Sequence, residues 1–316
     1  MDSPKPLVSI CCITYNHKNY IRDCLEGFLM QKTNFPFEVL IHDDASTDGT
    51  IDILKEYQAK YPDIIKPYFE IENCYSQGKP FTVPNYSRAV GKYLAFCEGD
   101  DFWTDKNKLQ MQYDFMEAHT DYSMCGTGLY LLNHIEKTYR PVAFPKSDFD
   151  GQTRELSLKI LCGQHPFRNQ TVFVRMQDYR AAQLDIARDK KDAPMGDLQL
   201  FFHMSLHGKL KFIRKRTATY RVSTTSVSHY DNKDKYDSFV KRCQESIVKI
   251  AINNGFTEYV TTISSCLMKN HESGRKNTTC LLKILIWCKR ALLGYFSNYK
   301  KFMGMTPQDR VKFRID

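Results

Sequence analysis

Apolar runs and amphipathic stretches alternate along the first 120 residues. Short apolar runs, which are typical of buried parallel strands, lie at 7–13, 37–41, 64–69 and 93–97. Apolar residues at helical spacing lie after or between these runs, at 20–30, 50–61, 86–90 and 105–118. This alternation predicts an α/β fold, with a mostly parallel sheet and helices on both of its faces.

The pattern changes after residue 120. Strands are predicted at 122–132, 135–142, 171–174, 210–213 and 219–222. A helix is expected from Asp197 to His207, and mainly helices from 236 onward. We therefore expect a domain over 1–230, with halves 1–120 and 121–230, followed by a helical C-terminal extension over 231–316.

Composition narrows the class of protein. Hydrophobic residues make up 42% and charged residues 26% of the chain, as in ordinary globular proteins. The formal net charge of +9 either serves solubility or attracts anions such as nucleotides and phospholipid headgroups. No basic-aromatic stripe is present, so we expect no nucleic-acid partner.

The cysteines and the termini bear on the compartment. None of the eleven cysteines forms a Cys-x-x-Cys pair, and several lie in apolar runs, which favours reduced, buried thiols. No signal region or membrane-spanning run is visible, so we expect a cytoplasmic protein. The apolar stretch 280–301 carries interspersed Lys and Arg. It either lies on the cytoplasmic membrane face as a peripheral helix or packs against protein.

Three polar segments directly follow predicted strands, at 14–17, 42–49 and 98–101. In open parallel sheets, ligands bind outside the carboxyl ends of the strands. The three segments are therefore expected to line one site.

The second and third segments are rich in carboxylates. Asp44 could accept hydrogen bonds from a nucleotide base or ribose, whereas the segment 46–48 also suits a helix cap. Glu98, Asp100 and Asp101 lie so close in sequence that they repel one another unless a cation lies among them. Oxygen ligands suit Mg²⁺ or Mn²⁺, and the alternative is a solvated acidic turn.

Two later features carry candidate chemistry. Asp197 begins a predicted helix, so it is either an N-cap residue or a general base, and the residues alone favour the cap. Arg221 precedes a polar loop that ends at His229. This loop could cover a diphosphate, or it could be an ordinary surface loop.

Taken together, the motifs resemble those of the family 2 inverting glycosyltransferases of the GT-A fold, in particular bacterial enzymes of surface-polysaccharide synthesis. The resemblance covers about residues 6–230 and rests on segments that appear in the family's order and spacing. These are Val8-Ser9-Ile10, Thr14-Tyr15-Asn16, Asp43-Asp44-Ala45-Ser46-Thr47-Asp48-Gly49-Thr50 and Glu98-Gly99-Asp100-Asp101-Phe102-Trp103.

The resemblance implies roles for these residues. Asp100 and Asp101 match the element that binds ribose and metal, either aspartate being the direct ligand of Mn²⁺ or Mg²⁺. Asp197 matches the catalytic base. Ser223 stands where many relatives have a histidine, and His229 is a candidate to replace it. The nucleotide is expected to contact Thr14, Tyr15, Asn16, Asp44, Arg88, Glu98 and Asp100.

The implied function is transfer of a sugar from a nucleoside diphosphate sugar, in particular a UDP-sugar. The acceptor is expected to be a hydroxyl of a saccharide or a lipid-linked saccharide. Residues 1–120 would bind the nucleotide and 121–230 the acceptor. Two alternatives remain open: a sugar-nucleotide nucleotidyltransferase, and a non-catalytic protein that binds sugar nucleotides.

Overall fold

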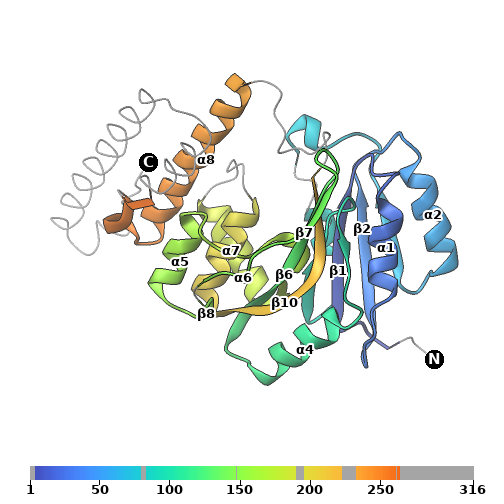
Figure 1. The fold of residues 1–316 in the computed structure, drawn as a ribbon, viewed down its shortest axis with the longest axis horizontal. Coiled ribbons are helices and arrows are strands. Elements are labelled where there is room, and N and C mark those ends of the chain that lie inside the picture. Colours follow the sequence, from blue (N-terminus) through green and yellow to red (C-terminus); the bar gives the residue numbers. More distant parts are fainter. Residues whose placement is uncertain are drawn as a thin grey trace, which may run out of the picture. The chain divides into compact units, whose positions relative to one another are not determined.

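The computed structural model describes residues 4–79, 83–146, 148–189, 196–222, 233–260 and 262–263 (Figure 1). The chain divides into two compact units. The first comprises Met1–Ser157, His165–Arg188 and Gly196–Asp231, and the second comprises Leu158–Gln164, Asp189–Met195 and Asn232–Asp316.

The first half of the first unit is a parallel sheet. Its strands are β1 (Val8–Thr14), β2 (Phe37–Asp43), β3 (Ile65–Phe69) and β4 (Tyr93–Phe96), which lie in the order β3-β2-β1-β4. The helices α1 (Ile21–Leu29), α2 (Thr50–Lys60) and α3 (Val83–Ser87) connect these strands. The predicted α/β alternation is confirmed.

The second half of the unit makes the sheet mixed. It adds β5 (Phe102–Trp103), α4 (Lys108–Ala118), β6 (Tyr122–Asn133), β7 (Thr138–Pro141), β8 (Asp150–Gly151), α5 (Arg154–Leu161), β9 (Phe173–Arg175), α6 (Met176–Asp189), α7 (Gly196–His207) and β10 (Lys209–Val222). β9 lies antiparallel between β4 and β6, and β10 pairs parallel with β6. The sheet is therefore parallel only in part, and its order is β3-β2-β1-β4-β9-β6-β10-β5.

This topology decides where the strands end. Since β9 runs antiparallel to both of its neighbours, β4 and β6 point in the same direction. The carboxyl ends of β1, β2, β4, β6 and β10 therefore lie at one edge of the sheet. Ligands of such sheets bind at this edge.

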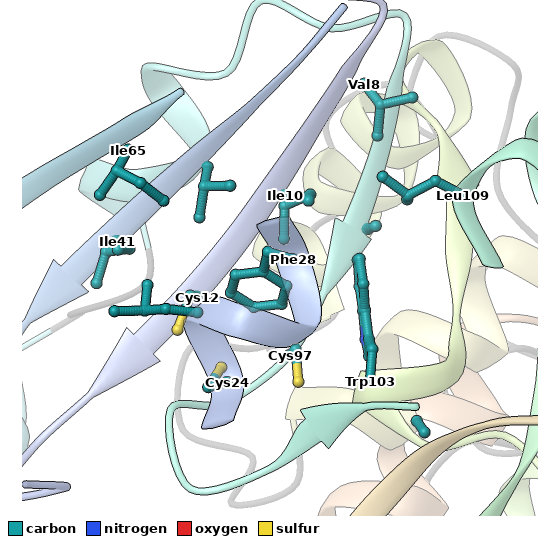
Figure 2. Close-up of a cluster of buried hydrophobic side chains, with 14 of the residues drawn as sticks. Val8, Ile10, Cys12, Cys24, Phe28, Ile41, Ile65, Cys97, Trp103 and Leu109 are labelled. Carbon is teal, nitrogen blue, oxygen red and sulfur yellow. The ribbon is translucent and has the colours of Figure 1, made fainter. Parts of the chain in front are cut away.

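Helices cover both faces of the sheet. On one face, β1 contributes Val8, Ile10 and Cys12 to a core that α1 completes with Leu25 and Phe28 (Figure 2). On the other face, Tyr86 of α3 lies 5.3 Å from Tyr179 of α6, between ring centroids, and both rings contact Phe96 of β4. Burial of the alternating side chains on both faces explains why these strands are apolar nearly throughout.

The core extends to Trp103 of β5, which lies two residues after the acidic segment Glu98-Gly99-Asp100-Asp101. Trp103 is buried, and its ring lies 4.9 Å from that of Phe28 in an edge-to-face arrangement (Figure 2). Helix α1 can approach this strand so closely because Gly27 has no side chain. A Cβ atom at Gly27 would lie 2.9 Å from the backbone nitrogen of Trp103.

We expect Gly27→Ala to destabilise the protein by about 1–3 kcal/mol, because backbone atoms cannot make room as a flexible side chain would. Chemical denaturation followed by circular dichroism measures this loss. Gly196→Ala is the control, since a Cβ atom there meets nothing within 4 Å. Equal stability of the two variants would contradict the close approach of α1 to Trp103.

The second unit contains α8 (Lys233–Asn253), which is helical as the pattern from 236 predicts. Its buried side chains include Ile247, Val248 and Ala251. No helix among the described residues is long and apolar enough to cross a membrane. The stretch 280–301, for which either membrane contact or packing against protein was expected, lies outside the described residues.

Candidate active site

The loop after β1 is fastened to the loop after β2. The backbone nitrogen of Asp44 donates to the carbonyl oxygen of Thr14 at 3.0 Å. Asn16 has a left-handed backbone conformation, with φ of 54°. Its backbone nitrogen donates to Ser46 Oγ at 2.8 Å, and its side-chain oxygen accepts from the backbone nitrogen of Thr47 at 2.8 Å. Asn16 therefore shapes the site, and Tyr15 beside it is exposed.

The carboxylates after β2 also hold backbone. Asp43 accepts from the backbone and the hydroxyl of Ser46 at 2.9 and 2.6 Å. Asp48 accepts from the backbone and the hydroxyl of Thr50, at the start of α2. Asp48 therefore holds the first residue of α2, whereas Ser46 joins the loops after β1 and β2 through Asn16 and Asp43, and the N-cap residue of the helix is Gly49.

The structure gives Asp44 and Arg88, both predicted to bind the nucleotide, contacts within the protein. The Asp44 carboxylate is buried and accepts from the backbone nitrogens of Cys74 and Tyr75, at 2.7 and 3.1 Å. The Arg88 guanidinium donates to Asn85 Oδ1 at 2.8 Å and lies 5.6 Å from the Tyr68 ring centre. Asp44 thus fixes the loop after β3, and Arg88 lies against the sheet face.

The acidic segment after β4 lies directly against the loop after β1. The backbone nitrogen of Gly99 donates to the carbonyl oxygen of Ile13 at 2.8 Å. A Cβ atom at Gly99 would lie 2.8 Å from Thr14 Oγ1 and 3.0 Å from His17 Nδ1. Only glycine allows this approach, which brings Thr14 and His17 beside Glu98 and Asp100.

His17 belongs to the segment 14–17 that was expected to line the site, but no role was predicted for it. Burial lowers its pKa, while Asp100, Asp48 and Asp43 act in the opposite direction. Its Nδ1 atom and the Thr14 hydroxyl oxygen are buried and have no hydrogen-bond partner within the part of the chain that the structure describes. Both atoms are therefore available to a ligand or to water at the sheet edge.

Glu98 connects the acidic segment to α7. Its pKa is raised to about 7: burial is the main cause, the charges of Asp100 and Asp197 contribute, and a hydrogen bond from Asn169 acts in the opposite direction. The effect of Asp197 places the start of α7 near Glu98. Asp197 itself is half-buried, and its Oδ1 atom accepts from the backbone nitrogen of Leu198 at 2.8 Å.

Asp101 points away from solvent. It is only 2% exposed, and Oδ1 accepts from the backbone nitrogen of Arg221 at 2.8 Å. Burial raises its pKa well above the ordinary value, and Asp100 and Glu98 add to this effect. The side chain therefore ties the acidic segment to the end of β10.

The Arg221 side chain, a predicted diphosphate contact, already has partners within the protein. Its guanidinium pairs with Asp23 of α1 and lies between the rings of Tyr20 and Phe102, 5.0 and 4.6 Å from their centres. Arg221 therefore joins α1, β5 and β10 at the sheet edge. His229 lies outside the described residues.

The carboxylates of the acidic segment could supply some, but not all, of the ligands that a hard divalent cation needs. No group of three or more His, Cys, Asp or Glu side chains in the described ranges could hold a metal ion alone. The crowded carboxylates Glu98, Asp100 and Asp101, two of which have raised pKa values, would nevertheless be stabilised by a nearby cation. Mg²⁺ is commonly bound by one or two carboxylates plus substrate phosphates, which this arrangement permits.

Asn169 was missed, because it lies far from the acidic segment in sequence and no motif marks it. It belongs to the turn η2 (Asn169–Thr171). Its Nδ2 atom donates to Glu98 Oε1 at 2.8 Å. The fold alone brings this amide to the site.

Known proteins share both the sequence pattern and the fold. The sequence model of glycosyl transferase family 2 matches residues 9–175. An uncharacterized protein of Mycobacterium tuberculosis is 31% identical over 233 residues, which are 72% of this chain and 63% of that protein. The putative teichuronic acid biosynthesis glycosyltransferase TuaG of Bacillus subtilis is 37% identical over 130 residues, 41% of this chain and 50% of that protein.

Solved structures agree on the fold. S. aureus TarS 1-349 in complex with UDP-GlcNAc superposes with a TM-score of 0.58 at 19% identity, covering 87% of this chain and 75% of that chain. The mannosyltransferase PcManGT from Pyrobaculum calidifontis, in complex with GDP-Man and Mn2+, has a TM-score of 0.51 at 15% identity, covering 92% and 85%.

The fold and the family match are those of an α/β protein of the glycosyltransferase type, similar in sequence to a putative enzyme of teichuronic acid biosynthesis. The chain belongs to glycosyl transferase family 2. Its match spans 63% of the length of the mycobacterial relative.

Proposed function

We propose that this chain is an inverting glycosyltransferase that moves a sugar from a UDP-sugar to a hydroxyl of a saccharide or lipid-linked acceptor. One observation carries the proposal. The ends of β1 and β4 and the start of α7 bring Thr14, His17, Glu98, Asp100 and Asp197 to one edge of the sheet. This arrangement supports the proposal, because residues proposed to bind the nucleotide lie at the same edge as the candidate base.

UDP is the proposed nucleotide for two reasons. The loop 14–16, together with Asp44, Arg88 and Glu98, resembles the family's nucleotide-binding segments. The complex of TarS with UDP-GlcNAc has the same fold. The nucleotide would extend from the loops after β1 and β2 toward Asp100.

Asp197 is the proposed general base. As the acceptor hydroxyl attacks the anomeric carbon, its proton passes to the Asp197 carboxylate and the bond to the diphosphate breaks. Attack from the side opposite the leaving group inverts the anomeric configuration. The partial exposure of Asp197 leaves its carboxylate accessible to an acceptor.

Asp100 is the proposed direct ligand of Mn²⁺ or Mg²⁺. It is partly exposed, whereas Asp101 is buried and accepts the Arg221 backbone N–H. When bound, the ion supplies Lewis-acid stabilisation of the negative charge that grows on the leaving diphosphate. The protein's part is to present the Asp100 carboxylate from a segment that Gly99 and Asp101 hold in place.

A thermal-shift screen tests the proposal. UDP with Mn²⁺ is expected to raise the melting temperature, because a ligand that binds only the folded state stabilises it by about 2.7 kcal/mol at one hundred times its Kd. UDP-sugars are then assayed for transfer to saccharide acceptors and for hydrolysis. A melting temperature that no nucleoside diphosphate changes, with or without metal, would contradict the proposal.

A further inference from the structure

Two hydrogen bonds link the turn η2 to the acidic segment and to the strand β5 that follows it. Asn169 donates to Glu98 Oε1 at 2.8 Å, at one end of the segment. Just beyond the segment, Trp103 Nε1 of β5 donates to the carbonyl oxygen of Gln170 at 2.9 Å. The turn is thus bound to the segment at Glu98 and to the adjoining strand at Trp103, whose donor is buried.

The turn is itself rigid. The backbone nitrogen of Arg168 donates to Thr171 Oγ1 at 3.2 Å, and that hydroxyl donates back to the Arg168 carbonyl oxygen at 2.7 Å. Gln112 of α4 donates from Nε2 to the carbonyl oxygen of Thr171 at 3.0 Å. Because Gln112 and Thr171 are buried, this contact is shielded from competing water.

The chain just before this turn packs against α7, the helix that carries Asp197. Phe167, just before the turn, is buried, and its ring centroid lies 6.0 Å from that of Phe201 in α7. The turn therefore lies between the acidic segment and α7. Asn169 donates to Glu98 where this carboxylate experiences the negative charges of both Asp100 and Asp197.

We propose that Asn169 is a positioning residue that holds the Glu98 carboxylate toward the ribose hydroxyls of the nucleotide. An amide donor on Oε1 fixes the rotation of the carboxylate and leaves Oε2 to accept from a ligand hydroxyl. Without this donor, repulsion from Asp100 and Asp197 turns Glu98 away. This inference rests on the proposed function, since it requires a nucleotide at the site.

Calorimetric binding of UDP, 2′-deoxy-UDP and 3′-deoxy-UDP in the presence of Mn²⁺ tests the inference. The wild type is expected to bind UDP about tenfold more tightly than the deoxy analogue that lacks the contacted hydroxyl. A factor of this size is usual for the loss of one hydrogen bond to a charged group. Asn169→Ala is expected to weaken UDP by this factor and to leave that analogue unchanged. A merely structural role would weaken all three ligands alike.

A double-mutant cycle shows whether Asn169 acts through Glu98. Asn169→Ala should have no further effect in a Glu98→Ala background, because the group that it positions is then absent. Additive losses would overturn the inference. Asn169→Leu, which has a similar volume and no donor, repeats the test if the alanine variant unfolds, and unchanged discrimination in this variant also overturns it.

The outcomes separate this inference from the proposed function. A wild type that binds none of the three ligands contradicts the proposed function itself. A wild type that binds all three equally contradicts only the ribose contact. Asn133→Ala is the matched control, since Asn133 also holds a turn, by accepting from the backbone nitrogens of Ile135 and Glu136 at 2.9 and 3.0 Å, and this variant should discriminate as the wild type does.

Discussion

Asp197→Asn is expected to lower the rate of sugar transfer by at least about a hundredfold and to leave the Kd for UDP unchanged. General base catalysis contributes about 10²–10⁴ to a rate, and an amide cannot accept the acceptor's proton. Asparagine preserves the size of the side chain and the oxygen that accepts from the Leu198 backbone nitrogen. The start of α7 should therefore remain intact, and the loss should fall on kcat.

The control for this experiment lies on the same helix. His207 at the other end of α7 pairs with Asp185 at 2.7 Å, on the partly exposed surface. His207→Gln should transfer sugar at the wild-type rate. If Asp197→Asn retains full transfer while binding UDP, the proton must pass to another group, and the assignment of Asp197 is wrong.

The sequence predicted the parallel half of the fold more completely than the mixed half. The strands that become β1 to β4 are short and apolar nearly throughout, because both faces of the sheet are covered. By contrast, β10 was predicted as two strands. Its middle holds Arg214, Lys215 and Arg216, and its pairing with β6 shifts register between Ile213 and Ala218. A polar irregularity of this kind interrupts the apolar pattern without ending the strand.

The residues of the candidate site likewise include some that the sequence predicted and some that it did not. Thr14 and the acidic segment were predictable because each directly follows an apolar strand, and strand ends meet at one edge. His17 was predicted to lie at the site but was assigned no role, and Asn169 was missed. Asn169 comes from a turn that approaches Glu98 only after β9 has paired with both β4 and β6. No local sequence pattern predicts such a long-range contact.

Contacts within the protein also distinguish the predicted binding residues that already have partners from those that remain accessible. Asp44 and Asp101 accept backbone N–H groups, so their main contribution is to fix loops at the edge of the sheet. The Arg221 guanidinium is already paired with Asp23. Asp100 differs, since it is partly exposed among groups whose positions are fixed. A rigid surround with one accessible carboxylate is suited to placing a cation reproducibly.

Asp100 and Asp101 should therefore respond differently to substitution. Asp100→Asn is expected to remove the increase in melting temperature that Mn²⁺ adds to UDP and to lower transfer by about a hundredfold or more, as for other groups that stabilise a leaving group's charge. The stability of the unliganded protein should change little, because the Asp100 side chain is partly exposed.

Asp101→Ala should instead destabilise the unliganded protein by about 1–3 kcal/mol, because it leaves the buried backbone N–H of Arg221 without its acceptor. Denaturant titration of the two variants without ligand measures this difference, and titration of UDP-bound protein with Mn²⁺ measures metal affinity. If Asp101→Ala abolishes the Mn²⁺ effect with unchanged stability while Asp100→Asn retains it, the direct ligand is Asp101. Its carboxylate would then have to leave the Arg221 backbone when the metal binds.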